Sequence, residues 1–552
     1  MSQKSPRPRS VWSARYFGVA AVVYVMVGTA ALWLLSPRVP YADQWRHYAR
    51  LLSEPFAAGV FTADNGHAEV LPNLIRLADL RWCGGHELLQ ILTTGISAIA
   101  ALLLLLSIVR RDPSLDPVGK SAAAFCLAFG LFWLGNMHAL TLPGDGVHVY
   151  LVLLCVALAL RLIAGDTTPT RWRFALAALL CCVASFTFGS GMASFIALAT
   201  LLWPQRGGLR RIALLGLVAL AALSLYLSLP DATHTPQSGV SHPLQSTQHF
   251  LQILGMPFVY LFWPLLDPAA AAAVPGPLRG IALATANFWT AHGGSIRTSV
   301  FPQALIGTAM LGATITATWR MRQSGNAARL GIALAWFGIA CAGLIALARG
   351  SYFDAHPEQI YALRYLPWIG IAWCGLLLAG IARMPCSRPT YALALCLPLL
   401  ALPSEWGLLK LAQHVQAVAE DSALGAAVGV LPADLPLGET RLEDVRAALP
   451  ELRTANTAMF AWLASAALRH SLPANAHRLI AAGVDADRVT NVLGANAMRL
   501  RADFPSPVCA QHALVAVDGV SVGLLRRTDR EGWRGFAAAD AAAGFQFYAL
   551  CE

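Results

Sequence analysis

Charged residues are scarce in this chain, because Asp, Glu, Lys and Arg make up only 13% of its 552 residues. A soluble domain carries about 25% charged residues. Hydrophobic residues reach 57%, and the mean hydropathy is +0.55. These values exclude a soluble enzyme, a disordered chain and a fibrous protein. A membrane β-barrel is not predicted either, because the apolar runs are unbroken and about twenty residues long. A polytopic helical membrane protein remains.

The sequence also lacks the motifs of several chemistries. Neither an HExxH motif nor a Walker sequence occurs, so a metalloprotease or an ATP-driven protein has no support, and we predict no hydrolase. The 11 cysteines form no CxxC pair, which leaves a structural zinc site without support. The net charge of +10 forms no basic stripe interleaved with aromatic residues. We therefore expect no nucleic-acid partner.

Lys and Arg are concentrated in alternate connections between the apolar runs, as the positive-inside rule describes. The basic segment 1–15 precedes an apolar run without a small-residue cleavage site, which predicts an uncleaved anchor with a cytoplasmic N-terminus. The alternation predicts about eleven spans, with the short hairpin near Gly189 as the weakest point. The predicted spans are 16–35, 88–109, 121–140, 147–164, 173–190, 191–204, 212–229, 301–319, 330–348, 366–382 and 390–402.

These spans divide the chain into a cytoplasmic segment 1–15, a transmembrane region 16–404 with outer loops 36–87 and 231–300, and a tail 405–552 outside the cytoplasm. The tail is long enough to fold as a domain. Thr440 and Glu443 have the spacing of a capping box that opens a helix toward His470. Apolar runs at 513–517, 520–525 and 545–550 predict strands. The predicted fold class is an all-α polytopic membrane protein with a C-terminal α+β extracytoplasmic domain.

The tail contains two cysteines, Cys509 and Cys551, and no charge cluster beside either indicates an activated thiolate. Disulfides persist in oxidising compartments outside the cytoplasm. We therefore predict a Cys509–Cys551 disulfide, with two free thiols as the alternative.

The first outer loop is dense in polar residues. Asp43 comes shortly after the first span and is flanked by Trp45 and Tyr48, so it is a candidate general base at the membrane surface. The alternative is an interfacial amphipathic helix with ordinary solvated charges. Further along, the loop contains His67 and Glu69, and a His in such a segment more often hydrogen-bonds the loop than binds a ligand.

Two arginines lie at outer span ends, Arg349 and Arg364, the latter followed by Tyr365. Such arginines can clamp a phosphate in forked geometry. The alternative is snorkelling to lipid headgroups. His138, Asp145 and His148 flank the short loop 141–146. These three residues either line one cavity together with the polar residues of the outer loops or belong to a plain helix-to-helix turn.

The arrangement resembles bacterial membrane proteins of the C-type glycosyltransferase (GT-C) superfamily, and is similar to a largely uncharacterised GT-C-like group. In that group "D-W" follows span one, "N-E-H-R-I-x-x-P-R-L" comes later, and "G-R" and "S-R-Y" border one outer loop. The resemblance covers roughly residues 15–385. The matching segments are Asp43-Gln-Trp45, Asn65 to Leu74, Arg349-Gly350, Leu363-Arg364-Tyr365, and Phe186 to Gly191 before Trp203-Pro204. Gly66, Ala68 and Asn73 depart from this pattern.

The resemblance implies a transferase of the bacterial inner membrane. It would move a sugar, with inversion, from a polyprenyl-phosphate carrier to a glycan or lipid acceptor outside the cytoplasm. Asp43 would be the base, with Glu69 in place of the missing acid. Arg349 and Arg364 would neutralise the leaving phosphate. His67, Asn65, Trp45 and Tyr365 would contact substrate, and a divalent ion beside Asp43, His67 and Glu69 is left open.

Two other functions compete with the transferase. One is a transporter or flippase of a lipid-linked glycan, although such proteins usually carry midplane polar residues and repeated halves. The other is a non-catalytic membrane protein whose outer domain binds glycan or a partner. Replacement of Asp43 would distinguish these three functions. Loss of a glycan product at normal expression of the protein would favour the enzyme.

Overall fold

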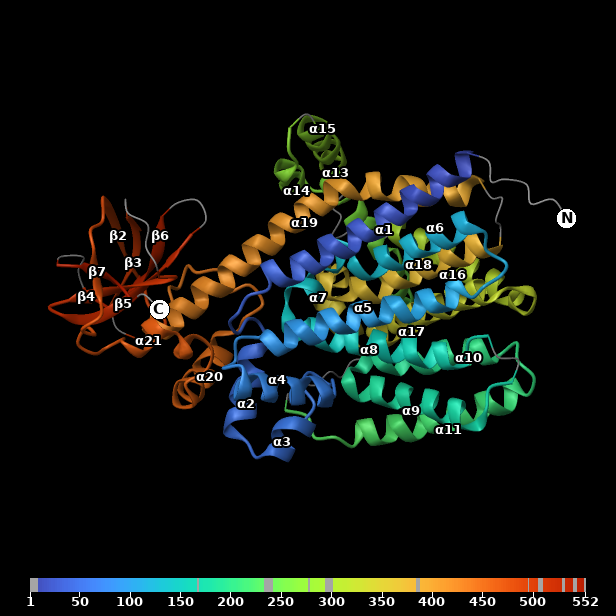
Figure 1. Ribbon diagram of the computed structural model, residues 1–552, viewed down its shortest axis with the longest axis horizontal. Coiled ribbons are helices and arrows are strands. Elements are labelled where there is room, and N and C mark those ends of the chain that lie inside the picture. The colour runs from blue at the N-terminus through green and yellow to red at the C-terminus, as the bar shows by residue number, and fades with distance from the viewer. Residues whose placement is uncertain are drawn as a thin grey trace. The chain divides into compact units, whose positions relative to one another are not determined.

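The computed structural model describes residues 8–165, 168–232, 242–276, 278–292, 301–383, 388–494, 496–504, 510–528, 532–539 and 544–550 (Figure 1). Two compact units divide the chain. Unit 1 comprises Met1–Ser36, Phe61–Pro72 and Ile91–Ala412, and unit 2 comprises Pro37–Val60, Asn73–Gln90 and Gln413–Glu552. Most of the first outer loop therefore folds with the C-terminal tail.

Unit 1 is helical (Figure 1). Its helices are α1 (Pro8–Leu35), α5 (Leu88–Arg110), α6 (Pro117–Phe132), α7 (Met137–Thr141), α8 (Pro143–Ile163), α9 (Arg171–Thr187), α10 (Ala193–Leu202), α11 (Gly208–Leu227), α12 (Pro243–Leu261), α13 (Trp263–Leu266), α14 (Pro268–Ala273), α15 (Leu278–Ala291), α16 (Phe301–Trp319), α17 (Asn326–Ala355) and α18 (Leu366–Arg383). A further helix, α19 (Arg388–Val428), contributes residues to both units.

Within the described residues, eight helical segments are long and apolar enough to cross a membrane. They are 12–35, 88–110, 117–141, 143–163, 208–227, 326–355, 363–383 and 391–428. The other three predicted spans are also helices, namely α9, α10 and α16. Large apolar side chains such as Met26, Leu217 and Leu220 are more than 60% exposed. Soluble monomers rarely expose contiguous apolar surface of this kind, so these faces suit lipid.

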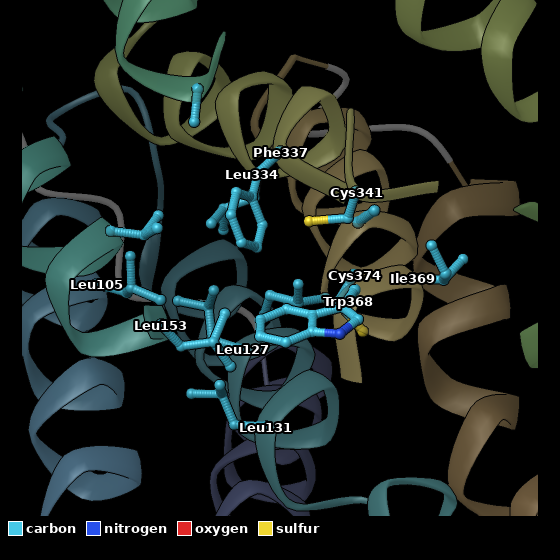
Figure 2. Close-up of a cluster of buried hydrophobic side chains, with 14 of the residues drawn as sticks. Leu105, Leu127, Leu131, Leu153, Leu334, Phe337, Cys341, Trp368, Ile369 and Cys374 are labelled. Atoms are coloured by element: carbon cyan, nitrogen blue, oxygen red, sulfur yellow. The ribbon is translucent and has the colours of Figure 1, made fainter. Parts of the chain in front are cut away.

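The core of unit 1 lies between α5, α6, α8, α17 and α18. Figure 2 shows leucines of the first three helices meeting Phe337 of α17 and Trp368 of α18. The α17–α18 pair packs closely through glycine, since a Cβ added at Gly331 would lie 2.3 Å from the carbonyl oxygen of Gly375. Small residues at such contacts let membrane helices approach each other.

Unit 2 combines helices with one antiparallel sheet. Its helices are α2 (Gln44–Ser53), α3 (Phe56–Phe61), most of α4 (Val70–Trp82), α20 (Leu442–Ala455) and α21 (Leu463–Ala466). Its strands are β1 (His477–Leu479), β2 (Gly483–Val489), β3 (Ala497–Asp503), β4 (His512–Val517), β5 (Val520–Arg527), β6 (Trp533–Ala537) and β7 (Gln546–Ala549), in the order β1-β7-β4-β5-β6-β3-β2. The predicted helical polytopic class with a C-terminal α+β domain is confirmed.

The sheet curls back on itself, because its two edge strands, β1 and β2, are joined by only residues 480–482. Leu500, Val515, Leu525 and Phe547 fill its interior. The three predicted strands correspond to β4, β5 and β7. Cys509 and Cys551 lie outside the described residues, so their disulfide stays a prediction.

Two sequence motifs of the tail, a capping box and a serine motif, have other roles in the structure. The capping box is wrong, because the Thr440 hydroxyl accepts a hydrogen bond from the Ala42 backbone at 2.8 Å, and α20 ends at Ala455. The segment from Gly519 to Gly523 has the GxSxG spacing of a hydrolase, but it begins strand β5 after a hairpin turn. The Ser521 hydroxyl is buried and donates to the Ala467 carbonyl, so it has a structural role.

Candidate functional site

A tight turn presents His67 at one end of unit 1. The backbones of Asp64 and His67 exchange two hydrogen bonds of 2.9 and 2.8 Å. Asn65 and Gly66 between them both have positive φ, of 50° and 73°. Asn-Gly is the preferred pair for such a type I′ turn. Gly66, which replaces an acid of the GT-C-like motif, is therefore a turn residue here.

The end of α11 holds this turn in place. The Tyr226 hydroxyl donates to the Gly66 carbonyl at 2.7 Å and accepts from the Ala68 backbone at 3.2 Å. Beside it, the Ala63 backbone donates to the Pro230 carbonyl at 2.7 Å. Two segments far apart in the sequence are thus joined, which restricts the orientations open to His67.

Two histidine rings enclose Phe188, which follows α9. The His67 ring stacks on Phe188 with centroids 4.3 Å apart, and the His148 ring of α8 stacks on it at 4.0 Å and 5°. Gly189 is needed beside this stack, because a Cβ there would lie 2.8 Å from the His67 Nδ1. The Phe-Gly pair of the hairpin therefore shapes the site.

Carboxylates connect the histidines. The Glu69 Oε1 lies 3.9 Å from the His148 Nδ1. Asp145 lies between two rings, with its oxygens 3.2 Å from the His138 Nδ1 and 3.9 Å from the His148 Nε2. The residues flanking loop 141–146 thus lie beside the predicted Glu69, at the short connection between α7 and α8.

Arg349, near the end of α17, adds a positive charge to this cluster. Burial, together with the nearby Arg349 guanidinium, lowers the pKa of His67 to about 4. His67 is therefore neutral at pH 7. Its Nδ1 is shielded from solvent and has no hydrogen-bond partner among the described residues. A neutral imidazole can accept a hydrogen bond from a hydroxyl through its unprotonated nitrogen.

Arg364 and Tyr365 come from the connection between α17 and α18. Arg364 donates to the Gln359 side chain at 3.2 Å, and its guanidinium lies 5.3 Å from the centroid of the Tyr365 ring. Tyr365 is buried and packs edge-on against Phe353 of α17, with centroids 6.1 Å apart. Arg364 is thus held beside an aromatic surface.

The remaining predicted residues belong to unit 2. The Asp43 carboxylate is 55% exposed and lies 3.1 Å from Arg46, which also binds Asp444 of α20 at 3.0 Å. Trp45 is fully buried, so in this conformation it serves packing rather than offering a surface to a ligand. Asn73 is buried too, and its amide donates to the Val60 carbonyl at 3.2 Å.

A buried polar network in unit 2 was not predicted. The Tyr48 hydroxyl donates to Glu87 at 2.7 Å, and the Gln90 amide donates to the Tyr48 oxygen at 2.9 Å. Burial raises the pKa of Glu87 well above its usual range, and the Asp79 carboxylate raises it further. Sequence reasoning missed this network because its members are 39 or more residues apart or look like ordinary loop residues. Residues of one side-chain network are expected to be energetically coupled.

A divalent ion beside Asp43, His67 and Glu69 was left open by the sequence. Among the residues that the structure describes, no group of three or more His, Cys, Asp or Glu is arranged to hold a metal ion. The unit 1 cluster combines the neutral His67 ring, two carboxylates and a guanidinium. Such a set suits hydroxyl groups and an anion.

No protein-family model matches the chain, and no curated protein sequence matches it. Among solved structures, the chain matches the Archaeoglobus fulgidus oligosaccharyltransferase, whose crystal structure is a complex with Zn and sulfate. The TM-score is 0.34 and the identity 13%, over 71% of this chain. The chain spans about half the length of that protein, namely 53%.

Proposed function

We propose that this protein is a membrane glycosyltransferase that uses a lipid-phosphate-linked sugar donor. The observation that carries the proposal is the cluster at one end of the unit 1 helices, where Glu69, the neutral His67 and Arg349 come together. Ionisable residues of membrane proteins that face the interior of the helix bundle are candidate functional residues. The motif resemblance to GT-C proteins supports the same class.

The reaction needs two protein groups of this kind, a carboxylate and a guanidinium. The acceptor hydroxyl attacks the anomeric carbon, the bond from that carbon to the phosphate oxygen breaks, and the phosphate leaves with the electron pair. A carboxylate takes the hydroxyl proton. A guanidinium stabilises the charge that develops on the leaving phosphate. Attack opposite to the leaving group inverts the anomeric centre.

Glu69 is the base that the contacts favour. It is buried beside His148 in the same unit as His67 and Arg349, whereas Asp43 belongs to unit 2 and pairs with Arg46 at 3.1 Å. His67 would accept a hydrogen bond from the acceptor sugar. Arg349, near the end of α17, would contact the leaving phosphate, and Arg364, in the connection from α17 to α18, would assist it. Asp43 stays the second candidate base.

The finer assignments follow the motif resemblance. The donor would be a polyprenyl-phosphate sugar, and the acceptor a glycan or lipid. The charge pattern supports an inner-membrane protein with a cytoplasmic N-terminus and the unit 1 cluster facing outward. Lipid-linked donors are held at the membrane surface, where this cluster would lie.

The test compares Glu69→Gln, Asp43→Asn and Arg349→Gln in cells that lack the wild-type gene. Envelope glycans and lipid-linked sugars are measured by mass spectrometry, and expression is measured in membranes. Loss of a base should reduce product about 100-fold or more. Glu54→Gln, an exposed carboxylate of the same loop, is the matched control and should leave product unchanged. Normal product in both carboxylate variants would contradict the proposal and favour a transporter or a binding protein.

A further inference from the structure

Helices α13, α14 and α15 form a small helical hairpin beside α19 (Figure 1). The three helices pack on one another around a core of small side chains, namely Ala271, Val274, Ala282 and Ala286. Residues 263–291 contain only two charged side chains, Asp267 and Arg279. This segment, called the α13–α15 hairpin below, is therefore almost free of charge.

Both charged residues stabilise turns of the α13–α15 hairpin itself. The Asp267 carboxylate accepts from the Trp263 indole at 3.2 Å and from the Ala269 backbone at 2.8 Å, at the start of α14. The Arg279 Nε donates to the Val274 carbonyl at 3.0 Å. These contacts explain both charges within the hairpin, so they do not indicate a partner of opposite charge.

One face of α15 exposes large apolar side chains. Ile281 and Phe288 are each 64% exposed, and Leu278 is 50% exposed. Their spacings of three and seven residues place them on one side of the helix, away from Ala282 and Ala286 of the core. Helix α15 has 14 residues, which corresponds to about 21 Å, whereas the hydrocarbon core of a bilayer is about 30 Å thick. The helix is thus apolar on its outer face but too short to span a membrane.

The contact with α19 indicates the level at which the α13–α15 hairpin lies. The large exposed apolar side chains described for α19 extend from Leu393 to Trp406, and the Lys410 Nζ lies 5.2 Å from the centroid of the Trp406 ring. A Trp at the end of an apolar stretch, followed by a Lys one turn later, is typical of the level of the lipid headgroups. A Cβ added at Gly407 would lie 3.6 Å from the Trp263 ring, so α13 contacts α19 at this level.

We infer that the α13–α15 hairpin lies in the interface of the bilayer, with Leu278, Ile281 and Phe288 inserted among the lipid chains. An amphipathic helix in this position buries its apolar face about 5–10 Å into the boundary between headgroups and acyl chains. Lipid is the occupant that the contacts favour, because the hairpin meets α19 where the lipid-suited surface of that helix ends. The attraction is hydrophobic, since both charged residues of the hairpin serve its own turns.

The experiment uses the full-length protein in phosphatidylcholine nanodiscs, with photoreactive benzoylphenylalanine at one position. Phe288 and Ile281 are the test positions. Asn287 is the matched control, because it is exposed on the same helix but lies about 100° from Phe288 around the helix axis. Lipid adducts and protein adducts are measured by mass spectrometry after illumination. We expect the lipid adduct at both test positions to exceed that at Asn287 at least about threefold, because the sides of an interfacial helix differ in depth by up to about 10 Å.

A second measurement needs no label and covers the case in which a labelled variant fails to fold. Phe288→Asp places a charge among the lipid chains, so it should lower the melting temperature in nanodiscs more than Asn287→Asp does. The adduct yields at the test positions should be the same when phosphatidylglycerol replaces part of the phosphatidylcholine. Equal lipid adducts at Phe288 and Asn287, adducts that join two copies of the chain, adducts that require phosphatidylglycerol, or equal melting temperatures of the two aspartate variants would overturn the inference.

Discussion

Acidification should destabilise the protein through His67. Burial and the nearby Arg349 lower the pKa of this residue from 6.5 to about 4 in the folded protein. The unfolded chain therefore binds more protons than the folded one between these two pH values. Stability contributed by neutral His67 is present above pH 6.5 and is lost as the pH falls toward 4.

The size of this effect follows from the pKa difference. One pKa unit corresponds to about 1.4 kcal/mol. The shift of the His67 pKa from 6.5 to about 4 therefore corresponds to about 3 kcal/mol of unfolding free energy. Between pH 7 and pH 4.5 the loss is about 2 kcal/mol. This is an upper value, because His67 is partly exposed and solvent screens its charge.

The assay is chemical unfolding of the purified protein in detergent at pH 7 and pH 4.5. His67→Phe keeps a ring to stack on Phe188 and removes the titrating group. The change in unfolding free energy between the two pH values should be smaller in this variant by up to about 2 kcal/mol. His356→Phe, at an exposed position, is the control and should behave like the wild type. Equal pH dependence in wild type and His67→Phe would refute the reasoning.

Three further predictions concern the turn, the topology and the tail. Gly189→Ala should cost about 1–3 kcal/mol in thermal unfolding, because its Cβ would lie 2.8 Å from His67 Nδ1 and 2.9 Å from the Tyr226 hydroxyl, whereas Gly216→Ala meets nothing within 4 Å and should not destabilise. Reporter fusions after Arg322 and after Glu552 should lie on opposite sides of the membrane; two cytoplasmic signals would contradict the predicted topology. Cys509 and Cys551 should resist alkylation in unreduced, denatured protein, since β7 pairs with β4 so that Ala549 is opposite Ala513. Full labelling of both thiols would exclude the disulfide.

The membrane helices can be predicted from local sequence, because a span in lipid must satisfy its backbone hydrogen bonds within its own helix. Long apolar runs and flanking arginines therefore predicted α1, α5, α8 and α17. The strands β4, β5 and β7 were predictable for a similar reason, since each contains an apolar run. Strand β2 was missed, because Asp485, Asp487 and Arg488 leave it no such run.

Residues whose partners are far away in the sequence could not be assigned locally. Thr440 was expected to cap its own helix, but its hydroxyl binds Ala42, which is 398 residues away. Gly66 looked like a lost acid, whereas the paired backbones of Asp64 and His67 make it a turn residue. His148 looked like part of a plain turn until its stacking on Phe188 placed it beside Glu69.

The most direct test of a lipid-phosphate-linked donor is native mass spectrometry of the protein purified from its own membranes. The account predicts a co-purifying polyprenyl-phosphate species in the wild type, and loss of that species in Arg349→Gln with the fold intact. A GT-C enzyme purified in the same way serves as the positive control. If the control carries such a lipid and this protein carries none, the proposed donor class is contradicted.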